Sequence, residues 1–172
     1  MHPTHFENLK VAFENQLYDL DNIDQVINIV GRSDQIELAA MSRQFRISFT
    51  LTDAKSVKSE VELSASLKEL ANELLGLDGG FGCDLFVHFY KEIAHIDRQC
   101  EQINNVLQEI WEPSLPIEQV LRFTYDIKKA EKQSYLNQTT IRFNRKLNER
   151  HMNDIPQLLA YVMKSLRELD QI

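Results

Sequence analysis

The spacing of apolar residues between positions 86 and 110 constrains the fold of this chain more than any other feature. Such residues recur there at alternating intervals of three and four positions: Phe86, Phe89, Ile93, Ile96, Cys100, Ile103, Leu107 and Ile110. The N-terminal segment has the same spacing, with a polar interruption at Gln16: Phe6, Leu9, Phe13, Gln16, Leu20, Ile23, Ile27 and Val30. A heptad-like seam of this kind is typical of one helix packed along another. The pattern predicts long helices that lie side by side.

Glycine and proline are scarce, and their positions divide the chain into long uninterrupted stretches. The breaks fall at Gly31, in a glycine cluster at 76–82, at Pro113 and Pro116, and at Pro156. Stretches of this length suit helices better than strands. We therefore predict an all-α fold, an antiparallel bundle of about six helices with heptad-like seams. The predicted helices cover residues 4–30, 33–51, 52–77, 86–110, 116–150 and 154–172.

Residues 45–51 fit two local structures. Phe45, Ile47, Phe49 and Leu51 alternate with polar residues, which is typical of a β-strand. A lone strand needs a partner, and the rest of the chain offers no convincing one. We favour a helix and keep a short β segment near 45–51 as the alternative. The whole chain, 1–172, is expected to form a single helical domain. Residues 77–82 are the candidate hinge between an N-terminal and a C-terminal three-helix half.

Basic residues concentrate in one segment of an otherwise acidic chain. The net charge is −7, yet residues 117–150 hold eight Lys/Arg and four Asp/Glu. On a single helix these cations, interleaved with aromatic residues, would form a surface for an acidic partner. The candidate partner-binding residues are Arg122, Tyr125, Lys128, Lys129, Lys132, Arg142, Arg145 and Lys146. Single-stranded nucleic acid is the alternative partner, and a solvated surface with no partner is the simplest interpretation.

A second candidate site combines His88, Glu92 and His95. Their spacing places three potential metal ligands on one face of a helix, and Glu-x-x-His occurs in helical di-iron and di-manganese proteins. Because this is the sole such motif in the chain, the site would need Glu60, Glu62 or Glu131 from a facing helix. A partly exposed polar surface without metal is the simpler interpretation, so we expect no cofactor.

No motif of nucleophilic catalysis, phosphate binding or dinucleotide binding is present in the sequence. We therefore expect a non-enzymatic helical protein-interaction module, such as an adaptor, a chaperone-like protein or a regulatory subunit. Unsatisfied seams would also permit a homo-oligomer. A nucleic-acid accessory protein and a helical metalloprotein are the two alternatives. The N-terminus lacks the features of a signal peptide and no apolar run is long enough for a membrane span, which predicts a cytoplasmic protein that does not bind membranes.

Overall fold

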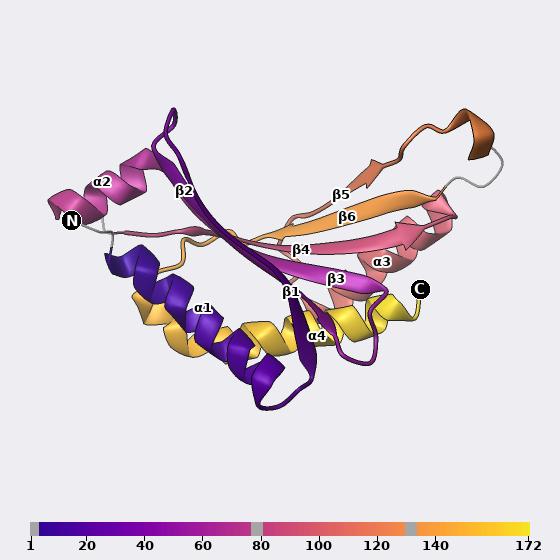
Figure 1. Cartoon of the computed structure of the whole chain (residues 1–172), viewed down its shortest axis with the longest axis horizontal. Helices are drawn as coiled ribbons and strands as arrows, with labels where there is room; N and C mark the ends of the chain where they lie inside the picture. Colours follow the sequence, from indigo (N-terminus) through magenta and orange to yellow (C-terminus); the bar gives the residue numbers. More distant parts are fainter. Residues whose placement is uncertain (1–3, 77–80, 130–133) are drawn as a thin grey trace.

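The computed structural model describes residues 4–76, 81–129 and 134–172 as an α/β fold (Figure 1). The elements are α1 (Thr4–Asn22), β1 (Ile27–Glu37), β2 (Ser42–Leu51), β3 (Val57–Ala65), α2 (Leu67–Leu75), β4 (Asp84–Ile93), α3 (Ile96–Ile110), β5 (Ile117–Arg122), β6 (Tyr135–Arg142) and α4 (Ile155–Asp170). Two short 3-10 helices, η1 (Ile127–Lys129) and η2 (Glu149–Asp154), flank β6. The prediction of an all-α six-helix bundle is therefore wrong.

The strands form one antiparallel sheet in the order β1-β2-β3-β4-β6-β5. Strands β1, β2 and β3 follow one another as a meander, and β4 joins β3 after α2. Strand β6 then pairs with β4, and β5 lies outside it at the edge. The strands before and after residues 77–82 thus belong to the same sheet. Residues 77–80 of the candidate hinge lie outside the described residues.

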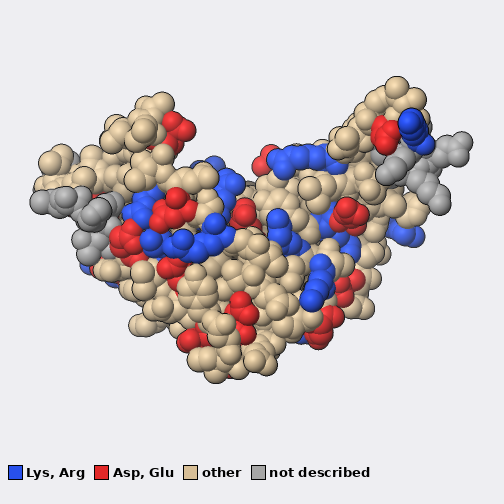
Figure 2. Space-filling view, viewed as in Figure 1, with Lys and Arg blue, Asp and Glu red and all other residues tan. Residues whose placement is uncertain are grey.

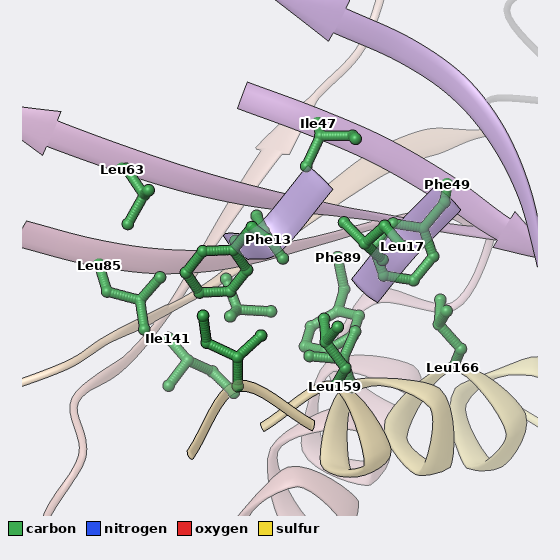
Figure 3. Packing of buried hydrophobic residues seen from close by; sticks show 14 of the residues in the cluster. Phe13, Leu17, Ile47, Phe49, Leu63, Leu85, Phe89, Ile141, Leu159 and Leu166 are labelled. Atoms are coloured by element: carbon green, nitrogen blue, oxygen red, sulfur yellow. The ribbon is translucent and has the colours of Figure 1, made fainter. Parts of the chain in front are cut away.

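Helices α1, α3 and α4 lie on one face of the sheet (Figure 1). Phe6, Leu9, Phe13 and Leu17 of α1 are fully buried, because their spacing places them on one side of the helix. Alternate residues of the strands point toward the same layer, so that Phe49 and Phe89 meet Leu159 and Leu166 of α4 (Figure 3). The core is thus a helix-on-sheet interior, with no seam between long parallel helices.

The opposite face of the sheet is polar, and no helix of the described residues lies over its middle (Figure 1). Antiparallel sheets commonly bury one face and expose the other. In the space-filling view the surface is hollowed between two raised ends, and positive and negative side chains are interspersed over it (Figure 2).

The seam predicted for residues 86–110 spans two different elements. Its first residues lie on β4, where Phe89 and Ile93 point into the core and Phe86 points to the polar face. Its second half is α3, in which Ile103 and Leu107 are buried. The spacing arises because a strand with large apolar residues on both faces is followed directly by an amphipathic helix.

Four further predicted helices are also corrected. Residues 52–77 contain strand β3 and the short helix α2. Residues 4–30 contain α1 and the start of β1, and residues 33–51 belong mostly to the β1–β2 hairpin. The segment 45–51, for which a strand was the alternative, lies within β2. Residues 116–150 form β5, η1, β6 and the start of η2. Among the described residues, no helix is both long and apolar enough to cross a membrane.

Candidate functional site

A groove of about 640 Å³ lies where the C-terminal end of α3 meets the N-terminal half of α4. The segment after β6, residues 143–147, forms its third side. Its volume falls within the range of small-ligand and peptide-anchoring pockets. Tyr161, on its wall, is 41% exposed, so the groove is accessible to solvent.

Aromatic side chains form the floor of the groove. Trp111 ends α3, and its ring lies edge-on to Phe143 at 5.7 Å and to Tyr161 at 5.6 Å between centroids. Its indole Nε1 donates a hydrogen bond of 2.9 Å to Ser165 Oγ, and that hydroxyl donates to the Tyr161 carbonyl oxygen. The single tryptophan of the chain is therefore fixed between α3 and α4. Leu115 and Leu158 extend the apolar surface beside it.

The segment 143–147 is held against the rest of the protein by its own contacts. The Phe143 backbone N–H donates to the Leu85 carbonyl, and Leu147 exchanges two backbone hydrogen bonds of 2.8 Å with Cys83. The Asn144 side-chain amide donates to the Ser114 carbonyl, which joins this segment to the turn after α3. The groove is thus formed by segments tied to the sheet and is preorganised for a ligand.

Charged residues of both signs lie along the rim. Arg145 is exposed and makes no ion pair with any described residue. Lys146 already contacts Asp84 at 2.8 Å and Glu69 at 3.6 Å. Burial lowers the pKa of Lys146, but these two carboxylates more than offset it and the pKa lies above its usual value. Arg145 is therefore the rim cation that remains available to an incoming carboxylate.

His151 also lines the groove, where it stabilises the start of η2. Its Nδ1 accepts a hydrogen bond of 3.1 Å from the Asn148 backbone N–H, and the Asn148 side chain accepts in turn from the Arg150 backbone. This capping box fixes the orientation of the imidazole. The ring therefore has a structural role at the start of η2.

The basic residues predicted for a single helix lie at opposite ends of the β5–β6 hairpin. Arg122, Tyr125, Lys128 and Lys129 follow or end β5. Arg142, Arg145 and Lys146 end or follow β6, and only the last two line the groove. Lys132 lies outside the described residues. The prediction of a continuous basic face on one helix was wrong, because residues 117–150 contain two strands.

The predicted metal ligands do not share one helix face. His88 and Glu92 lie on the polar face of β4, about 13 Å apart along the strand at 3.3 Å per residue. His95 lies outside the strand, at the N-cap of α3. Of the proposed completing residues, Glu60 and Glu62 lie on the neighbouring strand β3, and Glu131 lies outside the described residues.

The aromatic residues of the groove were not identified as a site from the sequence. Trp111, Phe143 and Tyr161 come from three separate elements, and their approach depends on the path of β6. A local signal exists for Trp111 alone, as a tryptophan followed by Glu112 and Pro113 at a helix end.

No family model, curated protein or solved structure matches this chain.

Proposed function

We propose that this protein is a non-enzymatic interaction module whose groove between α3 and α4 binds a short segment of a partner protein. The observation that carries the proposal is an accessible groove in which the exposed ring of Tyr161 and the half-buried ring of Phe143 lie against the buried Trp111. Tryptophan, tyrosine and arginine are the residues that most often dominate the energy of protein interfaces.

The chemistry of the groove supports a specific kind of segment. A large apolar side chain would pack against Tyr161 and Phe143, above the buried Trp111, and a carboxylate nearby would meet Arg145. An acidic partner is also what the concentration of cations in 117–150 predicts. Because Glu112 and Asp154 lie on the same rim, a segment with many negative charges would be repelled. We therefore favour one or two acidic residues beside an apolar anchor.

The distribution of cations favours a protein partner over nucleic acid. Nucleic-acid surfaces need several cations that follow a phosphate backbone. Here Arg122 and Lys128 lie at one end of the β5–β6 hairpin, and Arg145 lies at the other. Lys146 is already paired with carboxylates. The proposal therefore rests on the aromatic groove and not on the basic segment as a whole.

A display library of random peptide segments tests the proposal. We expect enriched segments to contain a large apolar residue with a neighbouring Asp or Glu. Binding of a synthetic segment should change the emission of Trp111, the one tryptophan of the chain. Tyr161→Ala should weaken binding about tenfold, which corresponds to about 1.4 kcal/mol, because truncation of an interface anchor costs at least this much. Arg145→Glu should weaken binding of the same segment.

Matched controls separate the groove from general surface effects. Tyr125→Ala removes an exposed tyrosine remote from the groove residues, and Arg98→Glu reverses an exposed arginine on α3. Both variants should bind the segment as the parent does. Equal binding by Tyr161→Ala and the parent, or a library that yields no recurrent segment, would refute the proposal.

A further inference from the structure

The polar face of the sheet contains a compact group of three potential metal ligands at its centre. Glu60 and Glu62 lie on β3, and His88 lies on β4. The register pairs Glu60 directly with His88, and Glu62 is the diagonal neighbour of His88. One ligand atom of each side chain lies within 4.8 Å of the others. The group is distant in the fold from the aromatic groove, since it lies on the opposite face of the sheet.

Two of these side chains are almost completely buried, although they lie on a face that no described helix covers. Glu62 is 6% exposed and His88 is 7% exposed. His88 Nε2 lies 2.9 Å from Glu62 Oε2. Two ligand atoms bound at 2.0–2.1 Å to one tetrahedral ion would be about 3.3 Å apart, so these two atoms need to separate by only a few tenths of an ångström to bind the same ion.

The imidazole of His88 is held in a fixed orientation. Its Nδ1 lies 2.8 Å from the Thr140 hydroxyl, across the β4–β6 ladder. The rings of Phe86 and Tyr90 flank it on the same strand at 6.1 and 6.3 Å between centroids. Histidines that bind metals have their second ring nitrogen fixed by a polar partner in this way. Nε2 is thereby directed at the carboxylate of Glu62.

Both carboxylates already have polar partners, which an ion would have to share or displace. Tyr90 donates a hydrogen bond of 3.1 Å to Glu60 Oε1, and Gln44 donates one of 2.6 Å to Glu62 Oε1. The Nε atom of Arg46 lies 3.1 Å from Glu62 Oε2 but is not aligned for a hydrogen bond. The Arg46 side chain is 42% exposed as a whole, although its Nε is buried, and an ion at this position requires the guanidinium to move away from the carboxylate. A cation would therefore replace a weakly directed ion pair.

We propose that Glu60, Glu62 and His88 bind a divalent first-row transition-metal ion, for which Zn²⁺ is the test case. One imidazole and two carboxylates form a mixed nitrogen and oxygen set that suits Zn²⁺, and the imidazole disfavours Mg²⁺ and Ca²⁺, which select oxygen ligands. Three protein ligands leave a fourth position of a tetrahedral ion for water or for a group from another molecule. This site is independent of the groove and goes beyond the proposed function.

Calorimetric titration of the chelator-treated protein with Zn²⁺ tests the site. The parent should bind one equivalent with micromolar or tighter affinity, and Mg²⁺ should produce no saturable heat. Glu60→Gln should weaken Zn²⁺ binding at least tenfold. It is the mildest ligand variant, because Glu60 is only half-buried and, within the described residues, hydrogen-bonds Tyr90 alone. His88→Ala should abolish saturable binding, and circular dichroism would establish that each variant is folded.

The control variants remove the same residue types from nearby positions. Glu92→Gln acts on the same face of β4, and His95→Gln acts on an exposed histidine before α3. Both should bind Zn²⁺ as the parent does. Thr140→Val should weaken binding about tenfold, because the loss of a partner that orients a metal-binding histidine usually has an effect of this size. Absence of saturable binding in the parent, or equal affinity in folded Glu60→Gln, would overturn the proposal without affecting the groove.

Discussion

Replacement of Arg43 by methionine tests how α1 is attached to the sheet. The Arg43 guanidinium donates two hydrogen bonds to Asp34 on β1, of 2.9 and 3.1 Å, and also contacts Glu7 on α1. It lies 4.5 Å from the centre of the Phe6 ring. Lys10 of α1 contacts the same two carboxylates at 2.8 and 2.9 Å. Four charged side chains thus join the first helix to the first two strands.

The expected loss follows from how deeply these groups are buried. Removal of one partner from a fully buried ion pair costs about 3–5 kcal/mol. The Arg43 side chain is 10% exposed, but those of Asp34 and Glu7 are 19% and 34% exposed, so water screens part of the uncompensated charge. Both carboxylates also keep Lys10 as a partner. We therefore expect Arg43→Met to lower the free energy of unfolding by about 2–3 kcal/mol.

The loss should also depend on pH in a defined direction. Burial raises the pKa of Glu7 and of Asp34, but the hydrogen bonds and charges of Arg43 and Lys10 more than offset it, so both values lie below normal. A carboxyl with a lowered folded-state pKa stabilises the protein above its unfolded pKa, about 4, and this contribution is lost as the pH falls further. The difference between parent and variant should therefore be largest near neutral pH and shrink below about pH 4.

Urea unfolding followed by the fluorescence of Trp111 measures this difference. Arg98→Met is the matched control, because Arg98 is exposed on α3 and makes no ion pair within the described parts of the chain; it should change stability by less than about 0.5 kcal/mol. If Arg43→Met lowers the free energy of unfolding by no more than this control, Lys10 alone is sufficient to hold the two carboxylates. If the stability difference between parent and Arg43→Met stays constant between neutral and acidic pH, these carboxylates do not cause it. Either result would refute the reasoning.

Three other predictions concern single buried or half-buried groups. Ile103→Ala should destabilise the protein by about 2–5 kcal/mol in urea unfolding, because the side chain is 1% exposed in the core; an unchanged midpoint would show that α3 is not packed as described. Burial raises the pKa of the Cys83 thiol far above its usual range, so Cys83 should react with iodoacetamide only after unfolding, as peptide mapping would show. Burial, with the nearby charge of Glu60, raises the pKa of Tyr90 to about 12. Subtracting the absorbance titration of Tyr90→Phe from that of the parent gives the titration of Tyr90 alone, and its midpoint should lie at this value. A midpoint near 10 would contradict the prediction.

The ends of the chain were the part of the fold that the sequence predicted well. The predicted C-terminal helix is confirmed as α4, and the five residues expected on one side of it are all buried: Ile155, Leu159, Val162, Leu166 and Leu169. The first helix begins at Thr4 as expected but ends at Asn22. Both helices have one apolar side and a polar remainder, which is the pattern that helical periodicity detects.

The turns between the strands were missed because glycine and proline do not mark them. Gln25 and Met41 adopt left-handed backbone conformations with φ of 54° and 49°. These positions precede β1 and β2, where glycine or asparagine would usually signal a turn. Without such residues, 4–30 and 33–51 each resembled one continuous segment. A strand pattern in 45–51 was visible, but its partners β1 and β3 were hidden by the same absence of turn signals.

Both candidate sites depend on register, which local spacing does not determine. Glu60 and Glu62 are two positions apart, so a strand places them on one face, whereas the helical interpretation separated them. His88 joins them only because Glu60 pairs with it across the β3–β4 ladder, and a shift of one residue would turn the imidazole into the core. That register is supported by Phe89 and Val87 on the buried face, which meet Ser59 and Val61. The same packing that stabilises the core therefore positions the proposed metal ligands on the opposite face of the sheet.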